Sequence, residues 1–225
     1  MSEKKITLSI ETAVQGGSLS LLRGNSELDY QIGARDTLNS EDILDDIKKI
    51  LERNEVGRKS IKKIVLSRGP GSYTGVRVGM AVGLGLKKAL DCEIVGASTL
   101  EAMVLVGKMA NLDVEEVITA VPIGRNQICW QNFKIDNLKI VDNQTLPKFS
   151  TIAEFLSFYC KSKHQSKKMI LHRKLYLKIR EMCENQLADT CNIIDAGENI
   201  ALLIGMAEAK TNGNEPLHPI YIRGD

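Results

Sequence analysis

Residues 69–85, GPGSYTGVRVGMAVGLG, contain six glycines and have the composition of a phosphate-binding loop. The backbone amides of such a loop can bind an anion where a helix begins. A Walker-type loop requires GxxxxGK[ST] after a strand, with the lysine in contact with the phosphates. Here Val76 and Arg77 follow Gly75, so the stretch does not match that motif.

A different kind of anion site could still begin at this loop, because Gly69, Gly71 and Ser72 can form a backbone nest at the start of the following helix. Glu11 and Thr12, which end the first predicted strand, are the second part of this candidate nucleotide or phosphate site. A carboxylate beside a phosphate needs a metal ion to offset the repulsion. A lone glutamate is more often a strand-end carboxylate that faces water, and this alternative is favoured for Glu11.

The remaining residues do not suggest a catalytic or metal-binding constellation. The three histidines lack the HxxxH and HExxH spacings of metal sites, and no Ser/His/Asp or Cys/His arrangement is recognisable. The five cysteines include no CxxC pair, so we expect reduced thiols rather than disulfides or a zinc site. The sequence therefore predicts no catalytic residue and no metal.

Charge and composition restrict the partners further. The segment from Lys161 to Arg180 is basic and could contact a nucleic-acid backbone, although a solvated helix face is the commoner explanation. The whole chain of 225 residues has a net charge of +2 and 4% aromatic residues, which argues against a general attraction to nucleic acid. There is no run of 18 apolar residues and no signal peptide, so we expect a cytoplasmic protein without membrane contact.

Hydrophobic periodicity predicts an α/β protein in which a similar plan occurs twice. The first half is expected to contain three antiparallel strands over 6–33, a helix at 40–53 capped by Asn39 or Ser40, a strand at 61–67, the glycine-rich helix at 76–90, a strand at 92–97 and a helix from 99. The second half is expected to contain three strands over 114–146, a helix at 151–159, a strand at 167–171, a helix at 173–187, a strand at 191–195 and a helix at 198–210. We therefore predict two lobes, 1–108 and 109–225, with mixed sheets flanked by helices. The last helix, about 198–210, could pack back on the first lobe.

Three glycines share one face of the glycine-rich helix, because Gly75, Gly79 and Gly83 are spaced four residues apart. A glycine inside a helix costs about 1 kcal/mol relative to alanine, so a close approach of another backbone must offset the loss. The approaching backbone belongs either to the chain's own sheet or to another helix. The apolar stripe of helix 40–53 is the natural neighbour within the chain.

Several stretches resemble the bacterial TsaB family, also called YeaZ. They are SRGPGSYTGVRVGMAVGLGLKKAL at 67–90, GASTLEAM at 96–103, the opening ITLSIETAVQGGSLSLL and the ending PIYIR at 219–223. The resemblance covers the first lobe well and residues 110–215 weakly. It implies two lobes of the actin-like (ASKHA, RNase H-like) fold.

The resemblance also implies a function in forming the threonylcarbamoyl modification of adenosine in tRNA. Family members are similar to the catalytic paralogue TsaD but lack its metal-binding histidines, and they act as non-catalytic partners that bind TsaD, with the ATPase TsaE joining the complex. They dock through the two helices of the first lobe, and some form homodimers through the same surface. The expected partner or dimer interface comprises Ile43, Leu44, Ile47, Leu51, Gly75, Val78, Gly79, Val82, Gly83 and Leu86.

By the same resemblance, this chain needs no cofactor of its own. ATP or ADP is expected only in the complex, and tRNA is reached indirectly through it. The chain departs from the family pattern at Glu11, Asn39 and residues 122–124, positions that concern a shared nucleotide rather than the helix surface. The alternative function is an enzyme that acts alone, either an actin-like nucleotide-binding hydrolase or a peptidase-like enzyme.

Overall fold

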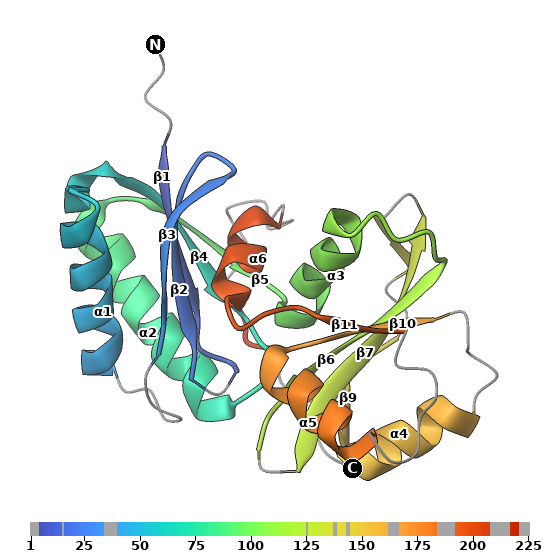
Figure 1. The fold of residues 1–225 in the computed structure, drawn as a ribbon. Helices are drawn as coiled ribbons and strands as arrows, with labels where there is room; N and C mark the ends of the chain where they lie inside the picture. Colours follow the sequence, from blue (N-terminus) through green and yellow to red (C-terminus); the bar gives the residue numbers. More distant parts are fainter. Residues whose placement is uncertain are drawn as a thin grey trace. The chain divides into compact units, whose positions relative to one another are not determined.

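The computed structural model describes residues 5–14, 16–33, 40–124, 126–136, 139–142, 145–161, 167–183, 192–207 and 217–220. These residues form two compact units (Figure 1). Unit 1 contains the described residues up to Ala102 and those from Asn199 onward, and unit 2 contains those from Met103 to Glu198. The division lies inside a helix, six residues before the predicted lobe boundary, and the last helix belongs to unit 1.

Unit 1 is built on a five-stranded sheet in the order β3-β2-β1-β4-β5. Its strands are β1 (Ile6–Glu11), β2 (Ser18–Arg23), β3 (Ser26–Ile32), β4 (Ile61–Ser67) and β5 (Glu93–Ala97). The first three strands are antiparallel, as their tight turns predict, and β4 and β5 run parallel to β1. Its helices are α1 (Ser40–Arg53), the short 3-10 helix η1 (Arg58–Ser60), α2 (Tyr73–Leu90), the start of α3 (Thr99–Met109) and α6 (Ile200–Met206).

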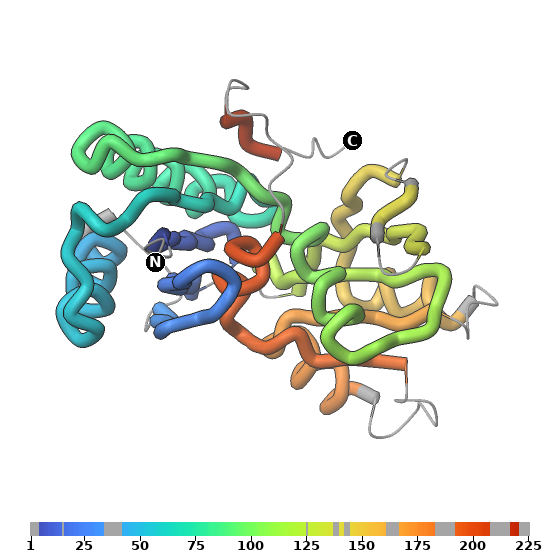
Figure 2. The backbone as a smooth tube through the Cα atoms, turned by 90° about the horizontal axis from the view of Figure 1, so that it is seen from above, coloured from blue at the N-terminus to red at the C-terminus, as the bar shows by residue number. Residues whose placement is uncertain are grey.

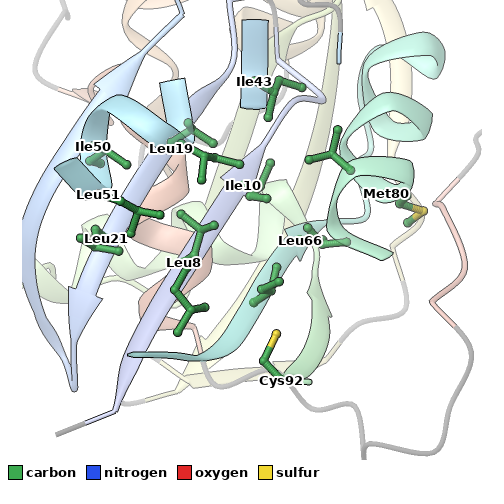
Figure 3. Close-up of a cluster of buried hydrophobic side chains, with 14 of the residues drawn as sticks. Leu8, Ile10, Leu19, Leu21, Ile43, Ile50, Leu51, Leu66, Met80 and Cys92 are labelled. Carbon is green, nitrogen blue, oxygen red and sulfur yellow. The ribbon is translucent and has the colours of Figure 1, made fainter. Parts of the chain in front are cut away.

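The two faces of this sheet are covered by different helices. On one face, apolar side chains of β1 and β2 point toward α1 and α2 and form the main core with Ile43, Ile50, Leu51 and Met80 (Figure 3). On the other face, α6 lies beside the blue strands β1 and β2 in both views (Figures 1 and 2). The backbone N–H of Ala201 donates to the Ser18 hydroxyl at 2.9 Å, which fixes the first turn of α6 on β2.

Unit 2 contains a six-stranded sheet in the order β11-β10-β6-β7-β8, with β9 also paired to β7. Its strands are β6 (Glu116–Pro122), β7 (Gln127–Asp136), β8 (Lys139–Asp142), β9 (Lys148–Thr151), β10 (Lys168–Leu171) and β11 (Ile193–Asp195). Helices α4 (Ile152–Lys161) and α5 (Arg173–Cys183) bury their apolar stripes against one face of this sheet. The aromatic core includes Trp130 and Phe155, whose ring centroids are 5.5 Å apart.

Most predicted elements are present, and the differences have local causes. Helix α2 begins at Tyr73 rather than at residue 76, because the Ser72 hydroxyl accepts a hydrogen bond from the Gly75 N–H and caps the helix earlier. Strand β9 was not predicted, because only four residues carry it and they lead directly into α4. Asn39, one of the two predicted helix caps, lies outside the described residues.

Candidate functional site

The loop before α2 forms hydrogen bonds with neighbouring segments of its own chain. The Ser72 N–H donates to the Ala13 carbonyl at 2.7 Å, and the Gly69 N–H donates to the Ser67 hydroxyl at 3.0 Å. The Ser72 hydroxyl is already the helix cap. Thus several polar groups that an anion nest at Gly69, Gly71 and Ser72 would use are engaged within the chain.

Glu11 is buried, with 1% of its surface exposed, so the expectation that its carboxylate faces water is wrong. Its Oε1 accepts hydrogen bonds from the N–H groups of Ala13 at 2.6 Å and Val14 at 3.0 Å. Burial raises the pKa of the Glu11 carboxyl from 4.5 to about 7, although these bonds and one with Ser67 act in the opposite direction. The carboxyl therefore closes the turn after β1.

The space near Glu11 is small. A hollow of about 10 Å³ lies between the end of β1, β2, β3 and α1, with Glu11, Thr12, Gln31 and Asp46 among its lining residues. This is room for about one water molecule. No group of three or more histidine, cysteine, aspartate or glutamate side chains suited to a metal ion occurs in the described part of the chain.

The glycine face of α2 packs on the chain's own sheet. A Cβ atom on Gly75 would lie 2.0 Å from the Thr12 carbonyl oxygen, and one on Gly79 would lie 2.2 Å from Thr12 Oγ1. A Cβ on Gly83 would lie 2.6 Å from the Leu66 side chain. The Thr12 hydroxyl also donates to the Gly75 carbonyl at 2.7 Å. The hypothesis that this face meets a partner helix is therefore corrected, because Thr12, directly after β1, and Leu66 of β4 occupy it.

The other residues of the predicted interface divide into two groups. The core of unit 1 buries Ile43, Ile47, Leu51 and Val82, because the apolar stripe of α1 faces the sheet. Val78 and Leu86 are partly buried against the same core, and Leu44 is 46% exposed. Of these seven residues, Val78, Leu86 and Leu44 therefore retain solvent-exposed surface that a partner could contact.

A different surface of the two helices is exposed, and we name it the outer helix surface. It consists of Leu44 on α1 and of Tyr73, Arg77, Ala81, Leu84 and Gly85 on α2. Tyr73 and Leu84 are 52% and 50% exposed, and the Arg77 guanidinium lies 3.7 Å from the centre of the Tyr73 ring. The sequence pattern did not single out these α2 residues. Helical spacing could have identified them. Arg77, Ala81 and Gly85 each lie two residues after a glycine of the buried face, and two residues correspond to about 200° around the helix. They are therefore expected on the opposite, exposed face.

Unit 2 contains a buried histidine with a structural function. His172 precedes α5 and is 3% exposed, and its Nδ1 accepts a hydrogen bond from the Lys174 N–H at 3.3 Å. Burial lowers the pKa of His172 from 6.5 to about 4, so the ring is neutral at neutral pH. It caps the helix, because its ring nitrogen lone pair satisfies one of the first N–H groups.

The basic segment noted in the sequence is partly engaged inside unit 2. Arg173 pairs with Asp195 at 3.0 Å, and the Arg180 guanidinium lies 5.6 Å from the centre of the Tyr176 ring. These contacts agree with the solvated helix face as the commoner explanation. Within the described ranges, no helix has the length and apolar character needed to span a membrane.

Comparisons with known proteins give a consistent result. The family model for "TsaD: tRNA N6-adenosine threonylcarbamoyltransferase" matches residues 37–211. The "tRNA threonylcarbamoyladenosine biosynthesis protein TsaB" of Escherichia coli K12 is 27% identical over 130 residues, which are 57% of this chain and 55% of that protein. The Haemophilus influenzae protein of the same name is 30% identical over 122 residues, 54% of this chain and 50% of that protein. The matched stretch thus spans about half the length of these curated relatives.

Two solved structures resemble the whole chain. "YeaZ from Pseudomonas aeruginosa" superposes with a TM-score of 0.63 at 18% identity, and covers 97% of this chain and 100% of its own. A second structure, described as an uncharacterized protein with similarity to peptidase YEAZ from Pseudomonas aeruginosa, gives a TM-score of 0.65 at 19% identity with the same coverage. The fold class expected from the sequence, two actin-like α/β lobes with mixed sheets, is confirmed.

Proposed function

Because this chain belongs to the TsaB/YeaZ family, which is related to TsaD, we propose that it is a non-catalytic subunit in the formation of tRNA threonylcarbamoyladenosine. The names of the curated relatives support this process, and the match to the TsaD family model supports common ancestry with the transferase. In this function the chain binds a TsaD-type transferase, and a TsaE-type ATPase joins the complex. ATP or ADP belongs to the complex, and tRNA is reached through it.

We assign the partner contact to the outer helix surface. The single observation that carries this assignment is Gly85. A Cβ on Gly85 would have nothing within 4 Å, so no contact within the described part of the chain explains a glycine that costs the helix about 1 kcal/mol. A partner helix that approaches closely does explain it, because small side chains allow short distances between helix axes.

The other residues of the outer helix surface suit a protein contact. Tyr73 and Leu84 on α2 and Leu44 on α1 each expose a large apolar side chain, and Ala81 is a second small exposed residue of α2. Exposed apolar side chains gathered on one surface, with an aromatic and an arginine, are typical of protein interfaces. The same surface serves a homodimer when the transferase is absent.

We expect Gly85→Arg to abolish association while the fold is retained, because the new side chain enters open space and arginine favours helix more than glycine. The measurement is size-exclusion chromatography with light scattering, for the chain alone and mixed with the TsaD of the same organism. Gly124→Arg is the matched control, because a Cβ on Gly124 also meets nothing within 4 Å and Gly124 lies in unit 2. A Gly85→Arg variant that still forms the wild-type complex would disprove the assignment.

The alternative function, a nucleotide-binding hydrolase or peptidase-like enzyme acting alone, draws no support from the geometry around Glu11. Its Oε1 accepts two backbone hydrogen bonds, and the adjoining hollow holds about one water molecule. We therefore do not propose it.

A further inference from the structure

An open depression lies at the end of the unit 1 sheet where β1 and β4 begin and β2 turns into β3. Its volume is about 490 Å³, which is within the range of small-molecule sites. Its lining residues include Lys5, Thr7, Arg23, Asn25, Lys63 and Glu93. None of them belongs to the outer helix surface, so the depression is a separate site.

The three cations of the depression come from three neighbouring segments at one end of the sheet. Lys5 precedes β1, and its carbonyl accepts a hydrogen bond from the Gly24 N–H at 3.3 Å, which holds the β2–β3 turn against it. Arg23, beside that turn, is paired in register with Ile6. Lys63 on β4 is the register partner of Thr7. Successive residues of a strand point to opposite faces, so Arg23 starts on the face of Ile6 and Lys63 on the face of Thr7. Both residues line the depression because it lies at the end of the sheet.

The charges of the depression are not balanced. Glu93 is the one carboxylate among its described lining residues, and its Oε1 lies 3.8 Å from Lys63 Nζ. Both side chains of this pair are partly exposed, and an exposed pair at this distance is weak. Lys5 and Arg23 add two further positive charges, and Thr7 and Asn25 add neutral hydrogen-bond donors. The lining thus has an excess of positive charge and of donors.

We propose that this depression binds phosphate groups. A concave surface lined by cations raises the local concentration of anions, and lysine and arginine are the side chains that most often bind phosphate. Three cations from three neighbouring segments suit an anion with several charges better than a single carboxylate. The phosphates come either from an RNA backbone or from a free phosphorylated small molecule.

Two neutralising substitutions test the site in the full chain. We expect Lys5→Gln combined with Arg23→Gln to weaken phosphate binding about 25-fold, which is about fivefold for each lost exposed ion pair. The control is Lys48→Gln on α1, the helix that covers the core face of the sheet and whose Lys48 lies outside the depression. The probes are inorganic pyrophosphate and ATP by titration calorimetry, and an unmodified tRNA transcript by fluorescence anisotropy at several salt concentrations. Circular dichroism establishes that each variant is folded.

The outcomes separate the two sources of phosphate and can also overturn the site. Binding of pyrophosphate or ATP that is lost in the double variant and kept in Lys48→Gln supports a free phosphorylated ligand. Binding of tRNA but of neither small phosphate supports an RNA backbone. The slope of log affinity against log salt concentration should then correspond to about two fewer released counterions in the double variant. If no probe binds at low salt, or if the double variant and Lys48→Gln lose affinity equally, the proposal is wrong. None of these readouts depends on a protein partner, so failure here leaves the proposed subunit function intact.

Discussion

Gly75→Ala is expected to destabilise unit 1 by about 3 kcal/mol, although alanine favours a helix more than glycine does. The new Cβ would lie 2.0 Å from the Thr12 carbonyl oxygen, which is backbone and cannot rotate away. Helix α2 must then move off β1, and the hydrogen bond from the Thr12 hydroxyl to the Gly75 carbonyl is lost. Thermal unfolding followed by circular dichroism should show a fall of roughly 10 °C for a chain of this length.

Gly85→Ala is the matched control on the same helix, because a Cβ at this position meets open space. It should raise the stability by about 1 kcal/mol, the ordinary gain of alanine over glycine in an exposed helix position. If Gly75→Ala were as stable as the wild type, α2 would not pack on β1 as described. The two variants also show why partner binding should be tested at Gly85. A Gly75 variant would lose its partners because unit 1 unfolds, and this loss would not identify a contact surface.

The glycines of α2 illustrate what periodicity can and cannot predict. Spacing of four residues is enough to identify a smooth helix face from the sequence alone. It does not say what covers the face, because Thr12 is more than sixty residues away in the chain and meets Gly75 only through the parallel pairing of β1 with β4. The family resemblance favoured a partner helix for this face, whereas the chain's own sheet occupies it.

The fold itself was largely predictable from local pattern. The stripe of α1 and the alternation in β1 each follow from side-chain spacing, and both pack as that spacing requires. The position of α6 in unit 1 could only be left open, because it depends on contacts such as Ala201 to Ser18, 183 residues apart. The burial of Glu11 was missed for a related reason: its partners are backbone amides in the following turn, and a sequence pattern does not reveal a turn that folds back on a side chain.

Glu11 gives unit 1 a definite pH dependence. Its pKa is about 7 in the folded chain and about 4.5 as the ordinary value, so the folded state binds the proton more tightly. The stability that the protonated carboxyl contributes is fully present below pH 4.5 and is lost as the pH rises through 7. The pKa shift corresponds to a change of about 3 kcal/mol in the free energy of unfolding. Glu11→Gln keeps an oxygen acceptor for the Ala13 and Val14 amides. Urea unfolding followed by circular dichroism should therefore show the variant to be more stable than the wild type at pH 8 and nearly equal at pH 4.5.

His172 gives unit 2 the opposite dependence. Its pKa is about 4 in the folded chain and 6.5 as the ordinary value, so the folded state binds the proton less tightly. The stability that it contributes is present above pH 6.5 and is lost as the pH falls through 4, again about 3 kcal/mol. The single tryptophan, Trp130, lies in unit 2, so its fluorescence follows the unfolding of this unit. His172→Asn keeps an acceptor for the Lys174 N–H and removes the titrating ring. Between pH 7 and 4.5 the fluorescence midpoint in urea should fall steeply in the wild type and much less in the variant, and equal slopes would mean that His172 is not the buried neutral group of this unit.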